Sequence, residues 1–170
     1  MQIMNQAGYD PRAMPRFFAT MNQKSQLNQT ANQFLPSFVR SHPLSSGRLS
    51  ESQSRAQRYD ALPLSKQQRH QALFDLLYWR TQSTGEHVSE TALTTAAKNS
   101  VGAKLALMYW YGEQQRFGEA NEIYTELSAL PAAQRQVLEP LLSITQSQIL
   151  TEQNKWQQAA ELLESQQRLY

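Results

Sequence analysis

The sequence predicts an all-α fold, in which a helical segment precedes an array of helical hairpins. Three observations support this prediction. Apolar residues between positions 65 and 170 recur at i, i+3, i+4 and i+7, the period of an amphipathic helix. Glutamine is the commonest residue, whereas the chain contains only 6 Gly and 7 Pro, which favours long helices over turn-rich β-structure. The chain has no cysteine, so disulfide scaffolds, zinc ribbons and cysteine nucleophiles are excluded.

The first segment, residues 1–62, is interrupted by glycine and proline and ends near Leu62-Pro63. Asp10-Pro11 predicts an N-cap followed by proline at the first helical position. The helix that follows has an apolar face formed by Met14, Phe17, Phe18 and Met21. Residues 22–33 are mostly polar and predict a solvated loop or a frayed helix end. We expect another helix to start near Ser45 or Ser46.

The second segment, residues 63–170, begins with a long apolar helix. The spacing of Ser65-Lys66-Gln67-Gln68 predicts a capping box at its start, and the helix is expected to stop before Thr84-Gly85. Ser89 and Ser100 are the predicted N-caps of the next two helices. These helices should reach Ala97 and Tyr111.

Three further helices are expected before the C-terminus. One carries Phe117 to Leu127 and ends before Pro131, and the next runs from about Ala132 to Leu150. Pro140 should kink that second helix. The last helix places four residues on one stripe: Trp156, Ala159, Ala160 and Leu163.

A pattern in these helices repeats after 39 residues. Phe117-x-x-Ala120-x-x-x-Tyr124 recurs as Trp156-x-x-Ala159-x-x-x-Leu163, a spacing typical of helical hairpin arrays. The first copy, with Leu107 and Tyr111 on the preceding helix, resembles the tetratricopeptide repeat, while an unrelated helical bundle is the alternative. A small residue lets paired helices approach closely. The residues expected to pack the repeats are Leu107, Tyr111, Phe117, Ala120, Tyr124, Trp156, Ala159 and Leu163.

Known catalytic motifs are absent from the sequence. It contains no HExxH, no nucleophile elbow, no P-loop and no dinucleotide-binding glycine motif. Of its three histidines, His42 stands out because Pro43 restricts its backbone to extended conformations. A formal net charge of +2 gives no reason to expect a nucleic-acid partner, and no apolar run is long enough for a transmembrane segment.

Two segments resemble a known family. They are Ala7-Gly8-Tyr9-Asp10-Pro11-Arg12-Ala13-Met14-Pro15-Arg16-Phe17-Phe18, and Phe38-Val39-Arg40-Ser41-His42-Pro43 with Arg48-Leu49. Their order, followed by helical repeats, resembles the HtpX-like zinc metallopeptidases that carry C-terminal tetratricopeptide repeats. In that family an HExxH helix and a later glutamate bind zinc before these segments. The resemblance therefore implies that residues 1–62 are the C-terminal tail of a metallopeptidase domain without its catalytic core, and that residues 63–170 are the repeat domain.

The resemblance implies a periplasmic metalloendopeptidase of envelope protein quality control, whose repeats bind substrate or partner proteins. Zinc is expected in the parent protein but not in this chain, which should be inactive alone. His42 matches a position near the family's active-site cleft and is a candidate accessory ligand or gating group, while a structural turn histidine is the alternative. Arg48 would lie near the same cleft. A different class also remains open, a non-enzymatic repeat adaptor with residues 1–60 as a docking arm.

Overall fold

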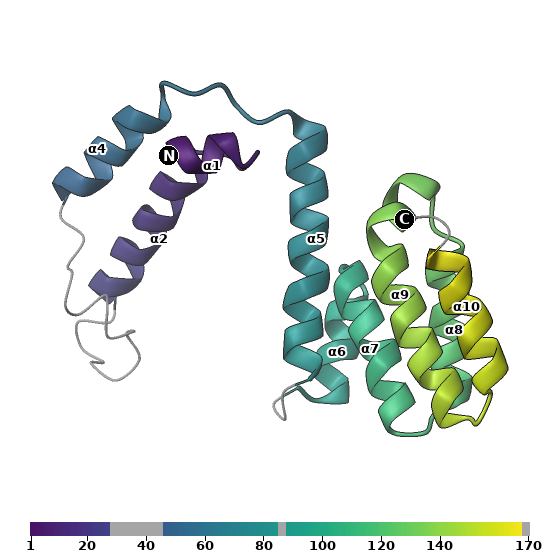
Figure 1. Cartoon of the computed structure of the whole chain (residues 1–170). Helices are drawn as coiled ribbons and strands as arrows, with labels where there is room; N and C mark the ends of the chain where they lie inside the picture. The colour runs from purple at the N-terminus through teal and green to yellow at the C-terminus, as the bar shows by residue number, and fades with distance from the viewer. Residues whose placement is uncertain (28–45, 85–87, 168–170) are drawn as a thin grey trace. The chain divides into compact units, whose positions relative to one another are not determined.

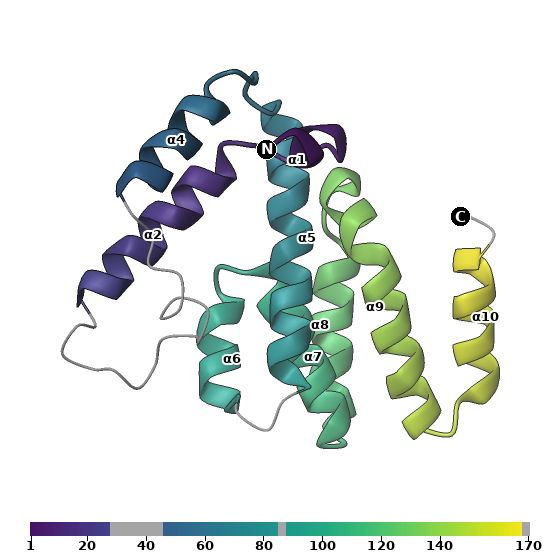
Figure 2. The same ribbon diagram turned by 60° about the vertical axis from the view of Figure 1, so that its left-hand side comes forward.

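The computed structural model describes residues 1–27, 46–84 and 88–167, and every regular element in these ranges is an α-helix (Figures 1 and 2). The all-α prediction is therefore confirmed. The chain divides into two compact units, Met1–Gln67 and Gln68–Tyr170. The border falls in the first turn of α5 (Leu64–Ser83), whereas the sequence break was expected at Leu62-Pro63.

The first unit contains three described helices, of which α2 and α4 pack side by side (Figure 1). They are α1 (Gln2–Gln6), α2 (Ala13–Leu27) and α4 (Ser46–Ala56). The turn after α1 requires a left-handed residue, which Gly8 supplies with φ +79°. The N–H groups of Gly8 and Tyr9 donate to the carbonyls of Asn5 and Met4 there. Gly8 thus follows the C-cap of α1, Ala7, as the left-handed residue that ends the helix.

The start of α2 differs from the prediction. The Asp10 carboxylate accepts the N–H of Arg12 at 2.9 Å and pairs with Arg16 at 3.0 Å, so Asp10 caps a turn and the helix begins at Ala13. At its other end α2 continues to Leu27, whereas a loop or frayed end was expected from residue 22. The remainder of residues 22–33 lies outside the described residues. Helix α4 begins at Ser46, as predicted.

The second unit consists of consecutive helices in which each of α7 to α10 packs on the helix before it (Figure 2). Helix α7 also packs on α9, so the hairpins α7–α8 and α9–α10 lie next to each other. Besides α5, the helices are α6 (Glu90–Ala97), α7 (Val101–Glu113), α8 (Phe117–Ser128), α9 (Ala132–Glu152) and α10 (Trp156–Gln167). The largest apolar side chains that are fully buried in their core are Leu93, Met108, Leu127, Leu138 and Leu142.

The capping box expected at Ser65 is wrong. Helix α5 begins one residue earlier, at Leu64, and the Gln67 side chain donates to the carbonyl of Leu62 at 2.6 Å. The first turn of α5 is closed by the backbone N–H of Gln67, which donates to the carbonyl of Pro63 at 3.0 Å. The end of the helix at Ser83 agrees with the prediction.

Asp75 in α5 joins this helix to the start of α7. Its carboxylate accepts the Ser100 hydroxyl at 2.8 Å and the N–H of Gly102 at 2.8 Å. The Ser100 oxygen in turn accepts the N–H of Ala103 at 2.9 Å, which confirms Ser100 as the N-cap. Ser89 caps α6 in the same way, by accepting the N–H of Ala92 at 3.2 Å. Two N–H groups at the start of α7 are thus satisfied, one by each acceptor.

The turns of the two C-terminal hairpins repeat in backbone geometry. Gln115 and Asn154, which are 39 residues apart, have φ of 58° and 61°. In the first turn the N–H of Arg116 donates to the Tyr111 carbonyl at 2.9 Å, and the bond at the same position in the second turn joins Lys155 and Leu150 at 2.9 Å. The 39-residue period of the sequence is therefore also a structural period.

Arg116 joins three helices at the first of these turns. Arg116 forms ion pairs with Glu90 of α6, at 2.8 Å, and with Glu119 of α8. Its guanidinium carbon also lies 4.4 Å from the centroid of the Tyr111 ring of α7. Hydrogen bonds from Arg116 lower the pKa of Glu119. We assign these contacts a structural role.

Candidate functional site

Polar side chains from three helices meet at Tyr109 in the second unit. The guanidinium of Arg80, from α5, lies 4.4 Å from the centroid of the Tyr109 ring, from α7. The same guanidinium donates to the side-chain carbonyl of Gln148, from α9, at 3.4 Å. The first helix of each of three successive hairpins thus contributes one member of the cluster.

A cavity of about 200 Å³ opens between α7 and α9 beside this cluster. Its lining combines Tyr109 with two exposed carboxylates, Glu113 and Glu152. The other lining residues are Gly112, Ser147, Gln148, Ile149 and Thr151. The cavity therefore offers hydrogen-bond acceptors, an amide and an aromatic ring to a ligand.

Gly112 explains how the two helices come so close at this cavity. A Cβ atom at Gly112 would lie 2.6 Å from the Ile149 side chain, closer than real carbon contacts allow. Any larger residue would push Ile149 aside or separate α7 from α9. The absence of a side chain at this position thus sets the width of the site.

The electrostatics of the site arise from its partial burial. Burial raises the pKa of Tyr109, Glu113 raises it further, and Arg80 opposes both effects. Tyr109 therefore stays a neutral phenol at physiological pH and keeps an O–H to donate. Within the described residues, the buried Nη1 of Arg80 has no hydrogen-bond partner. Such an unsatisfied buried donor is costly.

The residues expected to pack the repeats fall into three groups. Leu107, Ala120 and Ala159 are buried. Tyr111, Phe117 and Tyr124 are partly buried and pack against the core of the second unit. Trp156 and Leu163 differ from the expectation, because both are exposed on α10, as is Ala160. The physical reason is that α10 packs on α9 alone among the described helices, so its outer face has no neighbour.

The two candidates near the family's active-site cleft are in the first unit. His42 lies outside the described residues. Arg48 lies on an exposed face of α4. Its expected neighbourhood, the cleft of a catalytic domain, is a property of the parent protein and stays a prediction.

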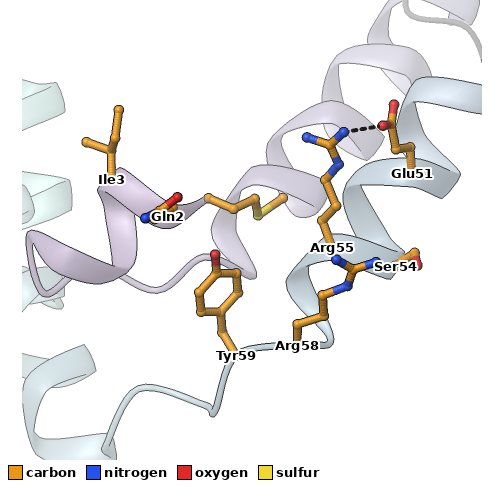
Figure 3. Close-up of a pocket in the computed structure, with 8 residues that line it drawn as sticks. Gln2, Ile3, Glu51, Ser54, Arg55, Arg58 and Tyr59 are labelled. Carbon is orange, nitrogen blue, oxygen red and sulfur yellow. Dashed lines mark hydrogen bonds and ion pairs between the residues drawn. The ribbon is translucent and has the colours of Figure 1, made fainter.

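The first unit has an open pocket of about 650 Å³ between α1 and the C-terminal half of α4 (Figure 3). Arg55 points toward Glu51 there and forms an ion pair with it at 2.6 Å. The remaining lining residues are Met1, Gln2, Ile3, Ser54, Arg58 and Tyr59. This lining contains neither a histidine nor more than one carboxylate side chain, so it lacks the donor set of a protease metal centre.

A metal site is not found among the described residues, which bring no three His, Cys, Asp or Glu side chains together as ligands. In the same part of the chain no helix combines the length and the apolar character needed to cross a bilayer. The described residues therefore do not fit a zinc ion, and we derive no metal chemistry from them.

The sequence pattern did not identify Arg80, Tyr109 and Gln148. Each lies outside the repeat positions, and their separations along the chain correspond to no short motif. The sequence offers only a weak signal for these three residues, because all that they share is a position on the first helix of a predicted hairpin.

Comparison with known proteins relates the chain to a protease. It is 27% identical over 149 residues to a protein of Yersinia pestis named beta-barrel assembly-enhancing protease. The match covers 84% of this chain but 26% of the relative, so the chain spans about a quarter of the relative's length. No family model matches the chain, and no solved structure matches it significantly.

Proposed function

We propose that the chain is the non-catalytic C-terminal part of a periplasmic zinc metalloendopeptidase in envelope protein quality control, and that its tetratricopeptide-like domain binds substrate or partner polypeptides. The observation that carries the first half is the similarity to a protease over 84% of the chain, which includes most of both units. The resemblance of residues 1–60 to the HtpX-like peptidases supports the metallopeptidase class. The 39-residue period of the hairpin turns supports the repeat assignment.

The binding half of the proposal rests on the cluster around Tyr109. An extended polypeptide presents backbone carbonyls as acceptors and backbone N–H groups as donors. The exposed amide of Gln148, which accepts a hydrogen bond from Arg80, can pair with either group. Glu113 and Glu152 can accept N–H groups at the cavity. Contacts of this kind bind many sequences, as a quality-control protein requires.

The binding experiment uses the full chain and a fluorescently labelled outer-membrane β-barrel protein, diluted from urea so that it is unfolded. We expect saturable binding that Arg80→Ala weakens roughly tenfold or more. The substitution removes the hydrogen bond that holds Gln148, a bond from a charged group worth about 1.5 to 3 kcal/mol, and the contact with the Tyr109 ring. Arg69→Ala is the matched control, since Arg69 is an exposed arginine of the same helix. Equal affinities for both variants would show that the cluster is not the binding site.

A chimera separates the protease assignment from a free-standing adaptor. This chain replaces the matching segment of the Yersinia pestis protease, and substrate cleavage is measured in cells. If the chain is the corresponding part of a peptidase, the chimera should cleave substrate and Arg80→Ala should reduce the cleavage. A chimera that folds, as judged by its melting curve, but is inactive would favour the adaptor.

A further inference from the structure

The outer face of α10 carries an exposed apolar stripe. Trp156, Ala160 and Leu163 follow one another at i, i+4 and i+7, and the exposed fractions of Trp156 and Leu163 are 60% and 43%. A hollow of about 580 Å³ lies beside Trp156 and is lined also by Lys155 and Glu161. Large apolar side chains exposed together in this way are typical of an interaction surface.

The internal repeat shows what kind of element covers such a face. Phe117 and Tyr124 of α8 stand 39 residues before Trp156 and Leu163, and both are partly buried against the core. Helix α8 packs on α7, its hairpin partner, and on α9, the first helix of the next hairpin. Helix α10 packs on its own hairpin partner, α9, alone among the described helices. Among the described helices, α10 therefore has no counterpart of α9, the first helix of the next hairpin, which covers α8.

Helix α5 has the properties of such a counterpart. In this unit the first helix of a hairpin packs on the second helix of the preceding hairpin, as α7 does on α6 and α9 does on α8. Helix α5 is the first helix of the array, so no second helix of the unit precedes it. Four of its apolar side chains are exposed at i, i+1, i+4 and i+5: Leu73, Phe74, Leu77 and Tyr78.

The charges of the two helices are also complementary. The charged side chains of α10 in its described part are Glu161 and Glu164, and Lys155 stands directly before the helix, whereas the exposed charged side chains of α5 include Lys66 and Arg69. Opposite charges around two apolar stripes favour this pairing over α10 with α10, or α5 with α5, where like charges would meet. The helices at the two ends of the array therefore both carry an exposed apolar stripe, and most of the charges near the two stripes are opposite.

We propose that the chain associates head to tail, with α5 of a second copy packed on the α10 face formed by Trp156, Ala160 and Leu163. The contact is heterologous, so every pair still has one free α5 face and one free α10 face. Association should therefore continue beyond dimers as the concentration rises. The proposal is independent of polypeptide binding at the Tyr109 cluster.

Sedimentation velocity of the full chain, from micromolar to submillimolar concentration, tests the proposal. The weight-average mass of the wild-type chain should rise from that of one chain to that of two or more. An α10 variant (Trp156→Ser with Leu163→Ser) and an α5 variant (Phe74→Ser with Leu77→Ser) should each stay monomeric. Ile144→Ser is the matched control, because Ile144 of α9 has the same exposed fraction as Leu163, 43%, and its loss should leave association unchanged.

The mixture of the two variants is the decisive sample. The α10 variant keeps an intact α5 face and the α5 variant keeps an intact α10 face, so together they should form one-to-one pairs that grow no further. A wild-type chain that is monomeric at every concentration would overturn the proposal. So would an α10 or α5 variant that still associates by itself, or a mixture that stays monomeric while circular dichroism shows both variants folded.

Discussion

The close contact between α5 and α7 should depend on Gly102. This residue is the second of α7, and a Cβ atom built there would lie 2.5 Å from the carbonyl oxygen of Asp75 and 2.7 Å from its carbonyl carbon. Both atoms belong to the backbone of α5, so no rotamer change can relieve the clash. Gly102→Ala must therefore separate the two helices and lengthen the hydrogen bond from the Gly102 N–H to the Asp75 carboxylate, now 2.8 Å.

The magnitude follows from opposing effects. Alanine favours a helix over glycine by about 0.5 to 1 kcal/mol. Overpacking costs about 1 to 3 kcal/mol, and a weakened hydrogen bond to a charged group costs up to about 3 kcal/mol more. We expect Gly102→Ala to lower the free energy of unfolding by about 2 kcal/mol. Gly118 is the matched control, because it is the second residue of α8 and its Cβ would meet nothing within 4 Å. Gly118→Ala should be neutral or stabilise the fold by up to about 1 kcal/mol.

Urea unfolding followed by tryptophan fluorescence measures both variants. All three tryptophans, Trp79, Trp110 and Trp156, lie in the second unit, so the signal reports that unit. The midpoint should fall for Gly102→Ala and should stay unchanged or rise for Gly118→Ala, in both cases without a change in slope. If Gly102→Ala were as stable as Gly118→Ala, the close approach of α5 to α7 would be wrong.

Three further predictions concern packing, pH and metal. Ala120→Leu should lower the free energy of unfolding by about 1 to 3 kcal/mol, because Ala120 is fully buried. Ala132→Leu, at an exposed helix start, should leave the stability nearly unchanged. Equal shifts in melting temperature for the two variants would contradict the repeat register. Arg116 lowers the pKa of Glu119, so the ionised Glu119 stabilises the folded state. This stabilisation is complete above the ordinary pKa range of a carboxyl group and is lost as the pH falls through the lowered pKa. Melting curves between about pH 6 and pH 3 should therefore fall less steeply for Glu119→Gln than for the wild type. Calorimetric titration of the chain with zinc should show weak or no binding, and a tight one-to-one site lost in His42→Ala would refute this.

The local signals of the sequence were the most reliable guides to the fold. Ser89 and Ser100 cap the helices they were expected to cap, because an N-cap depends on a side chain and an N–H only a few residues away. Ser65 does not cap α5 although its spacing was right, because the helix already starts at Leu64 and the Gln67 N–H donates to the Pro63 carbonyl. A start capped by Ser65 and a start at Leu64 were both compatible with the local sequence, and the pattern of residue types does not show which one is more stable.

The candidate site was beyond reach of the sequence for a different reason. Arg80, Tyr109 and Gln148 meet only because α5, α7 and α9 lie together, and each residue by itself is unremarkable at its helix position. In the sequence, Gly112 indicates only a position of low helix propensity. Its role in letting α7 approach Ile149 depends on a contact between residues 37 positions apart. Such long-range packing is what the hydrophobic period leaves undetermined.

Trp156 and Leu163 show how one motif can have two structural outcomes. The pattern that they share with Phe117 and Tyr124 states that a helix has an apolar face, but the partner of that face is set by the next element along the chain. On α8 the next element is α9, and the aromatic residues are partly covered. On α10 the same positions are exposed, although Ala159, which faces the hairpin partner α9, is as buried as the motif requires. The burial of the small residue therefore depends on the two helices of its own hairpin. The burial of the aromatic positions depends on whether the first helix of another hairpin packs on them.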